Sequence, residues 1–219
     1  MINNTSPRIS RNAQFVFRNH QSLMRRVLLR EAMDFITLDG LYLEFGVYYG
    51  FTINHMANCL PNKTIYGFDS WEGIPEEWWV KEDYHPKGCY STKGKLPRVE
   101  SNVKLVSGRF EDTLPIFAQE HPNMPTAFVH IDSDVYSSCK TIFKYMGHTF
   151  QPGTVIAFDE WTQDVGEMQA FNEWLDETGL YATMIRQSHQ QAYFVITADQ
   201  NAIPPVKITW EVTPPASVR

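Results

Sequence analysis

Residues 41–50 have the sequence Leu-Tyr-Leu-Glu-Phe-Gly-Val-Tyr-Tyr-Gly, and this stretch decides the fold. It predicts a short buried strand that runs into a glycine turn, after which a helix begins. Gly46 and Gly50 carry no Cβ atom, so the backbone can turn sharply there and approach a ligand closely. A second predicted strand, 64–68, is followed by Asp69, about 20 residues beyond the glycines, where doubly wound folds hold a ribose by its hydroxyls. The pattern therefore predicts a nucleoside-bearing cofactor.

The glycine spacing also bears on which nucleoside is bound. A dinucleotide site has the pattern G-x-G-x-x-G, so that backbone amides at a helix N-terminus face a pyrophosphate. This chain instead has Glu44-x-Gly46-x-x-x-Gly50, with an acid in place of the first glycine. A carboxylate repels a pyrophosphate and suits a cationic group. S-adenosylmethionine, which carries an ammonium and a sulfonium and no phosphate, is the cofactor that we predict.

Length and charge limit the class of protein. The 219 residues suffice for one domain that buries about 70% of its unfolded surface. The formal charge of −6 disfavours a nucleic-acid binder, which needs clustered lysines and arginines. Arg25, Arg26 and Arg30 do cluster, and we expect them to form a solvated helix face. The three scattered cysteines predict no disulfide framework and favour a reducing compartment.

The chain has neither an apolar run of about 18 residues nor an apolar N-terminal core, so we expect a cytoplasmic protein with no membrane segment and no signal peptide. Strands and helices alternate, which predicts an α/β, Rossmann-like fold: a mostly parallel seven-stranded sheet with helices on both faces. Two consecutive strands at the end predict an antiparallel hairpin at the sheet edge. The expected helices are 21–36, 52–59, 114–119, 137–146 and 167–177, and the expected strands are 41–45, 64–68, 103–106, 127–131, 154–158, 181–186 and 192–197.

This alternation assigns residues 21–198 to one domain, preceded by a flexible segment, 1–20, and followed by a proline-containing tail, 199–219, with a possible edge strand at 206–212. The connection 70–101 is too long for an ordinary loop and is rich in tryptophan and tyrosine. Long connections in compact domains are commonly functional lids, and the aromatic density argues against disorder. We therefore predict a lid there. The alternative is that these aromatics simply pack the segment onto the domain.

Acidic side chains follow several predicted strands, and ligands of such sheets bind beyond the carboxyl ends of the strands. The acids are Glu44, Asp69, Asp132, Asp134, Asp159 and Glu160. Asp134 alone could be a helix N-cap. Asp132, Asp159 and Glu160 would repel one another unless a proton or a cation lay between them, and such oxygen ligands suit Mg²⁺ or Ca²⁺. His130 shares a strand face with Asp132 and is either a core histidine or a general base.

Five stretches together resemble the macrocin O-methyltransferase family, metal-dependent class I S-adenosylmethionine methyltransferases that act on sugar hydroxyls. They are Leu-Glu-Phe-Gly-Val-Tyr-Tyr-Gly (43–50), Gly-Phe-Asp-Ser-Trp-Glu-Gly-Ile-Pro-Glu (67–76), Ser-Gly-Arg-Phe-Glu-Asp-Thr-Leu-Pro (107–115), His-Ile-Asp-Ser-Asp-Val-Tyr-Ser-Ser (130–138) and Ala-Phe-Asp-Glu-Trp (157–161). The first is generic for class I methyltransferases, whereas the second and fourth are more specific to this family. Glu160 stands where the family usually has a second aspartate.

The resemblance implies a site for each component of the reaction. Glu44 and Gly46 would line the methionine end of the cofactor, Asp69 would bind the ribose, and the turn Gly108-Arg109-Phe110 would lie beside the adenine. The remaining cofactor candidates in these motifs are Tyr48, Gly50, Ser70 and Asp132. Asp132, Asp159 and Glu160 would hold Mg²⁺, and the candidate acceptor-binding residues are Trp71, Asp134, Tyr136 and Trp161.

The expected chemistry is an in-line displacement in which an acceptor oxygen attacks the sulfonium methyl group. Alignment of the reactants contributes about 7–11 kcal/mol, and a divalent ion chelated by adjacent hydroxyls acidifies the attacking one. Asp132 is the expected proton acceptor, with His130 as the second catalytic candidate. The acceptor is expected to be a small sugar or glycoside. A catechol-like phenol and a catalytically silent cofactor-binding module remain alternatives, and a homo-oligomer is possible.

Overall fold

The computed structural model describes residues 23–80, 82–161 and 166–202. The N-terminal helix occupies residues 23–33 of this part. The other helices are α2 (Phe51–Cys59), α3 (Phe110–Glu120), α4 (Tyr136–Met146), the short 3₁₀ helix η1 (Gly147–Thr149) and α5 (Glu167–Thr178). The strands are β1 (Leu41–Phe45), β2 (Ile65–Asp69), β3 (Trp78–Val80), β4 (Asp83–His85), β5 (Val103–Ser107), β6 (Thr126–Ile131), β7 (Val155–Phe158), β8 (Tyr181–Ser188) and β9 (Gln191–Thr197).

Seven of these strands form one sheet in the order β5-β2-β1-β6-β7-β9-β8. The first five run parallel to one another, whereas β9 pairs antiparallel with both β7 and β8. The predicted Rossmann-like sheet with a C-terminal antiparallel hairpin is therefore confirmed. Because β9 inserts beside β7, β8 becomes the edge strand. The parallel strands bring their carboxyl ends to one edge of the sheet, where the predicted acids follow them.

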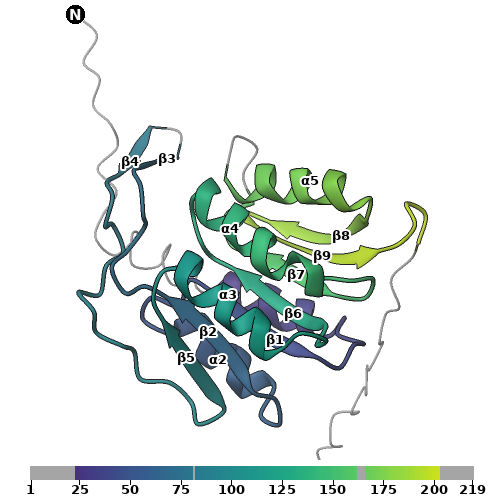
Figure 1. Cartoon of the computed structure of the whole chain (residues 1–219), viewed down its shortest axis with the longest axis horizontal. Coiled ribbons are helices and arrows are strands. Elements are labelled where there is room, and N and C mark those ends of the chain that lie inside the picture. The colour runs from purple at the N-terminus through teal and green to yellow at the C-terminus, as the bar shows by residue number, and fades with distance from the viewer. Residues whose placement is uncertain (1–22, 81, 162–165, 203–219) are drawn as a thin grey trace, which may run out of the picture.

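Each face of the sheet has its own apolar core. Along β1, Leu41, Leu43 and Phe45 pack against α3, α4 and α5, whereas Tyr42 belongs to the core beneath the N-terminal helix and α2. Figure 1 shows these two helix layers in front of and behind the sheet. Strand side chains alternate between the two faces, so both faces of a central strand must be apolar when helices cover both. This explains the unbroken apolar runs of β6 and β7, which are buried along their whole length.

Two helix boundaries differ from the sequence prediction by more than two residues. The N-terminal helix ends at residue 33 rather than 36, because the last amide groups bond three residues back in a tight turn. Gly40, between this helix and β1, permits close packing, since a Cβ atom there would lie 2.1 Å from the Pro125 carbonyl oxygen. Helix α3 begins at Phe110, four residues before the predicted start. Pro115 lies inside α3.

The long connection between β2 and β5 contains regular structure that the sequence did not predict. Its strands β3 and β4 form a separate antiparallel hairpin, in which Trp78 pairs with His85 and Trp79 with Tyr84. Figure 1 shows this hairpin standing apart from the main sheet. Trp79 and Tyr84 are about half exposed, so these aromatics do not all pack onto the domain.

Some sequence predictions lie outside the described residues, namely the N-terminal segment 1–20 and the possible strand 206–212. Among the described residues, no helix is long and apolar enough to cross a membrane.

Candidate functional site

A cavity of about 280 Å³ lies at the carboxyl ends of the parallel strands. Residues from the ends of β1, β2, β5, β6 and β7 line it, together with Arg25 from the N-terminal helix and residues of the β2–β5 connection. The structure thus brings together residues far apart in the sequence. The predicted site residues that line the cavity are Gly46, Tyr48, Asp69, Ser70, Gly108, Arg109, Phe110, Asp132, Asp134, Asp159 and Glu160.

The glycine turn after β1 is held by the carboxylate of Asp69. Asp69 Oδ2 accepts hydrogen bonds from the backbone N–H groups of Val47 (2.9 Å) and Tyr48 (2.8 Å), and Oδ1 accepts one from the N–H of Trp71 (2.7 Å). A carboxylate offers about four lone-pair positions, so one position remains for a ligand. Asp69 therefore shapes the turn in addition to facing the cavity.

Gly46 is required by a close approach between two strand ends. Its φ angle is 90°, and a Cβ atom there would lie 1.8 Å from the backbone carbonyl oxygen of Asp132. Its N–H donates to Phe68 O, and Asp132 N donates to Phe45 O, so the ends of β1, β2 and β6 are tied together at this point. The glycine therefore sets the distance between the turn after β1 and the acid after β6.

The turn from β5 into α3 forms another wall of the cavity. Gly108 N donates to Asp69 O, which fastens this turn to the end of β2. Arg109 precedes the first residue of α3, and its guanidinium pairs with Glu72 at 2.9 Å. The predicted role of Phe110 as a turn residue needs correction, because it opens the helix; its side chain still lines the cavity and packs edge-on against Phe45.

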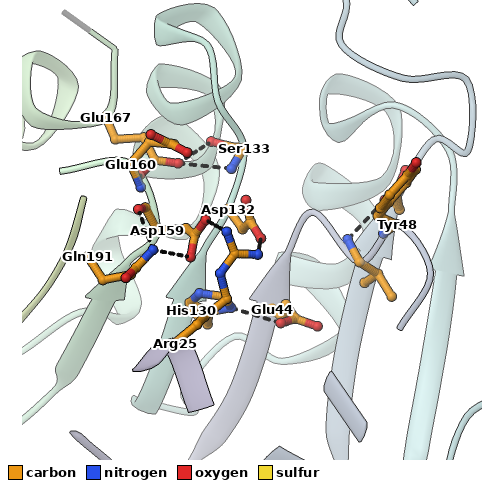
Figure 2. A network of polar contacts seen from close by, with 12 residues as sticks. Arg25, Glu44, Tyr48, His130, Asp132, Ser133, Asp159, Glu160, Glu167 and Gln191 are labelled. Carbon is orange, nitrogen blue, oxygen red and sulfur yellow. Dashed lines mark hydrogen bonds and ion pairs between the residues drawn. The ribbon is translucent and has the colours of Figure 1, made fainter. Parts of the chain in front are cut away.

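Asp132 and Asp159 form an acidic pair at the ends of β6 and β7, and the side chain of Arg25 lies between them (Figure 2). The Arg25 Nη2 donates to Asp159 Oδ2, and Nη1 lies 3.8 Å from Asp132 Oδ2. The expectation that Arg25, Arg26 and Arg30 share a solvated face is therefore wrong for Arg25. Arg26 lies over the Phe51 ring and Arg30 pairs with Asp34, so those two stay on the outer surface.

Burial raises the proton affinity of these acids. Burial and, next, the charge of Asp159 raise the pKa of Asp132 to about 7. Burial also raises the pKa of Asp159, although Arg25 opposes the shift. For Glu160, burial and the charge of Asp132 raise the pKa to about 7. Arg25 keeps its charge here, because Asp159 and Asp132 outweigh the effect of burial and raise its pKa. A cluster with these properties holds a proton or a cation.

His130 and Glu44 form a buried pair on neighbouring strands. They are register partners across β1 and β6, and His130 Nδ1 lies 2.8 Å from Glu44 Oε1. Burial raises the pKa of Glu44 to about 8 and lowers the pKa of His130, so a neutral pair is favoured near pH 7. Glu44 is fully buried and does not line the cavity. The expectation that it faces the cofactor's methionine end is therefore corrected.

The donor atoms available to a cation come from three side chains. One ring nitrogen of His130 and one carboxylate oxygen each of Asp132 and Asp159 lie within 4.8 Å of one another. Glu160 is not part of this group, and its Oε2 accepts a hydrogen bond from Gln190 at 2.8 Å. Two carboxylates and an imidazole fit a divalent cation. His130 is thus a core histidine that also borders the acidic pair.

Glu167, which the sequence gave no reason to select, supports this region from α5. Its carboxylate is fully buried; Oε1 accepts the N–H of Ser133 at 2.9 Å and Oε2 accepts the N–H of Glu160 at 3.2 Å. These bonds join the turns that follow β6 and β7 (Figure 2). Arg25 and Glu167 are therefore two charged residues of the site that sequence reasoning missed, and neither belongs to a short motif.

Besides Glu44 and His130, four predicted site residues lie away from the cavity lining. Trp71 is 3% exposed and donates from Nε1 to Ser107 Oγ at 2.9 Å. Trp161 packs among the rings of the α5-side core, and the Tyr136 hydroxyl donates to Glu173 at 2.7 Å. Gly50 precedes α2 with a left-handed φ of 78°, so its role is to begin the helix. Of the four predicted acceptor-binding residues, the structure brings only Asp134 to the cavity.

Sequence comparison assigns the family. A family model described as "Methyltransferase domain" matches residues 43–161, which is more than half of the chain. The chain belongs to this methyltransferase family. The matched region begins in β1 and ends after β7, so it contains the glycine turn, Asp69 and the acidic pair. No curated protein sequence matches the chain significantly.

Solved structures share the fold of this methyltransferase. The calicheamicin methyltransferase CalS11 aligns with a TM-score of 0.63 at 22% identity, covering 85% of this chain and 80% of CalS11. The O-methyltransferase NovP aligns with a TM-score of 0.59 at 19% identity, covering 81% and 79% of the two chains. An apo structure of CalS11, described as a TDP-rhamnose 3′-O-methyltransferase, aligns with a TM-score of 0.55 at 21% identity, covering 85% of this chain and 81% of CalS11. The class I methyltransferase fold is thereby confirmed, whereas the narrower macrocin resemblance stays a prediction.

Proposed function

We propose that this methyltransferase uses S-adenosylmethionine to methylate a hydroxyl of a sugar or glycosylated metabolite, with the help of a divalent cation such as Mg²⁺. One observation carries the proposal: a single cavity joins the glycine turn and Asp69 on one side to Asp132 and Asp159 on the other. A methyl donor and an acidic, cation-holding pair would therefore meet in one space.

The cofactor is proposed to lie along the ends of β1, β2 and β5. Gly46 and Tyr48 would approach it through the backbone turn, and Asp69 would accept a ribose hydroxyl at its remaining lone-pair position. Ser70 lies next to Asp69 in the lining. The adenine would occupy the space formed by the other predicted cofactor residues, Gly108, Arg109 and Phe110. The ring of Phe110, at the start of α3, offers an apolar surface for a base.

Asp132 and Asp159 are the proposed cation ligands, with His130 and Glu160 as candidates for a further position. A bound Mg²⁺ would lower the pKa of a chelated acceptor hydroxyl and orient it. The protein's own contribution is alignment and a proton acceptor. Asp132 is proposed to accept the proton, because its carboxylate borders the cavity beside the proposed cation position. Asp134 is the proposed acceptor-binding residue.

A sugar acceptor is favoured over a phenol by the neighbouring structures, one of which is described as acting on TDP-rhamnose. The test uses TDP-rhamnose and catechol as acceptors, S-adenosylmethionine as donor, and mass spectrometry to detect the added methyl group. Calorimetry with S-adenosylmethionine, with and without Mg²⁺, tests the alternative that the protein is a catalytically silent cofactor-binding module. Cofactor binding without methylation of any hydroxyl compound in a broad sugar-nucleotide panel would overturn the proposed activity.

The role assignments within the site are tested by Asp132→Asn and Asp159→Asn. Asp132→Asn should reduce methyl transfer by about 10²–10⁴-fold, the range for loss of acid–base assistance. Asp159→Asn should also reduce methyl transfer, because it removes a charged cation ligand. Both should leave S-adenosylmethionine affinity nearly unchanged. Calorimetry and single-turnover kinetics measure the two quantities separately. A large loss of cofactor affinity in either variant would contradict the division of the cavity into a cofactor side and a cation side.

A further inference from the structure

The side chain of Arg25 occupies the position at which the acidic pair would hold a cation. Its guanidinium donates to Asp159 Oδ2 and lies 3.8 Å from Asp132 Oδ2. The second oxygen of Asp159, Oδ1, lies 3.3 Å from Gln191 Nε2. Both oxygens of the buried Asp159 carboxylate are therefore engaged by side chains of this chain, and one partner is a permanent positive charge (Figure 2).

A divalent ion and this guanidinium cannot share the pair. Mg²⁺ takes oxygen ligands at about 2.0–2.1 Å in octahedral geometry. An arginine nitrogen that is hydrogen-bonded to Asp159 Oδ2 would therefore crowd the other ligands of an ion bound to the same carboxylate. The two positive charges would also repel each other across a few ångströms in a partly buried site. The same two carboxylates, with His130, form the group whose donor atoms lie within 4.8 Å of one another.

The N-terminal helix allows the side chain to leave without moving the backbone. Leu28, Leu29 and Ala32 are buried against the sheet and anchor the helix. The Arg25 side chain, in contrast, is 35% exposed and reaches the pair from the edge of the cavity. Because the helix is anchored and the Arg25 side chain is partly exposed, the guanidinium can exchange between the acidic pair and water by rotation of that side chain.

We propose that Arg25 is a built-in counter-ion that competes with the divalent cation for Asp132 and Asp159, so that cation binding requires the guanidinium to swing out. This inference rests on the cation site of the proposed function. Arg25 neutralises the pair when no ion is bound, which prevents the two carboxylates from repelling each other. It also raises the concentration of cation needed to load the site.

The test compares Mn²⁺ binding by wild-type protein, Arg25→Met and the matched control Arg30→Met, using calorimetry and the electron paramagnetic resonance signal of free Mn²⁺. Arg30 lies on the same helix, is mostly exposed and pairs with Asp34 outside the cavity. Arg25→Met should bind Mn²⁺ at least about tenfold more tightly than wild type, because one competing charge is gone. Arg30→Met should bind it as wild type does.

Arg25→Lys keeps a positive charge and provides a second variant if the methionine variant folds poorly; its Mn²⁺ affinity should lie between the other two. Equal or weaker Mn²⁺ binding by Arg25→Met would overturn the proposal, and so would absence of Mn²⁺ binding in every variant. S-adenosylmethionine affinity and methyl transfer are measured on the same samples. A wild-type enzyme that methylates its acceptor while Arg25→Met gains no Mn²⁺ affinity would refute the competition and leave the proposed function intact.

Discussion

Replacing Asp69 with alanine should both destabilise the protein and weaken its binding of S-adenosylmethionine. The carboxylate accepts three backbone N–H groups, from Val47, Tyr48 and Trp71, at 2.7–2.9 Å. A hydrogen bond of this kind contributes about 0.5–1.5 kcal/mol net, so losing all three should lower the free energy of unfolding by about 2–4 kcal/mol. Tyr48 adds to the effect, because its φ angle of 50° is unfavourable without that restraint.

Asp69→Asn is the matched control. Its single carbonyl oxygen can still accept two N–H groups, those of Val47 and Tyr48, but its amide NH₂ would face the N–H of Trp71. We therefore expect the unfolding free energy to fall by a smaller amount, about 1–2 kcal/mol, because one hydrogen bond is broken and one donor is left unsatisfied. Urea denaturation monitored by tryptophan fluorescence gives the unfolding free energies, and calorimetry gives cofactor affinity, which should fall at least about tenfold, or 1.4 kcal/mol, in the alanine variant.

Two outcomes would refute this reasoning. If Asp69→Ala lost cofactor affinity while keeping wild-type stability, the carboxylate would act on the ribose alone and would not shape the turn. If stability fell but cofactor affinity did not, the turn after β1 would not belong to the cofactor site. Only a loss of both quantities, with the asparagine variant intermediate in stability, agrees with the double role.

Three further predictions concern the stability of the fold. Gly46→Ala should lower the unfolding free energy by about 3 kcal/mol or more in a urea titration, since its Cβ would lie 1.8 Å from a backbone oxygen. Gly94 is also at positive φ but lies in open space, so the control Gly94→Ala should lower the unfolding free energy by only about 1–2 kcal/mol. Glu167→Gln should cost about 1–3 kcal/mol in the same titration, because its NH₂ must face a backbone N–H. Glu173 is partly exposed, and hydrogen bonds, first of all from the Tyr136 hydroxyl, lower its pKa from 4.5 to about 2. A carboxylate whose pKa is lower in the folded state stabilises the fold fully above pH 4.5, and this stabilisation is lost as the pH falls toward 2. The difference in unfolding free energy between wild type and Glu173→Gln should therefore narrow over this pH range. A constant difference would contradict the lowered pKa of Glu173.

The sequence was a good guide to whatever depends on local pattern. Apolar runs bounded by glycines predicted the strands of the sheet, and acids directly after β6 and β7 predicted the pair Asp132 and Asp159. These inferences succeed because the carboxyl ends of parallel strands must meet at one edge, whatever the details of packing. The order of elements along the chain therefore carries enough information to locate the cavity.

What the sequence did not predict depends on contacts between distant segments. Glu44 lies on a strand that is buried on both faces, and its orientation toward His130 follows from the register of β1 against β6. Trp71 was assigned to a lid because it lies in an aromatic-rich connection, yet its indole donates to Ser107 on β5 and is buried. Neither partner is near in sequence, and side-chain type alone does not identify it.

Arg25 illustrates the same limit with a functional consequence. Its position among other basic residues on an amphipathic helix is typical of a solvated face, and 134 positions separate it from Asp159. The first described turn of the helix lies near the sheet edge where the acids gather, so the long side chain of Arg25 can reach them while the helix's apolar residues stay packed. An arginine at this position stabilises two buried carboxylates in the absence of an ion. The N-terminal helix contributes nothing to the methyltransferase motifs, yet through Arg25 it influences how readily the cavity accepts a cation.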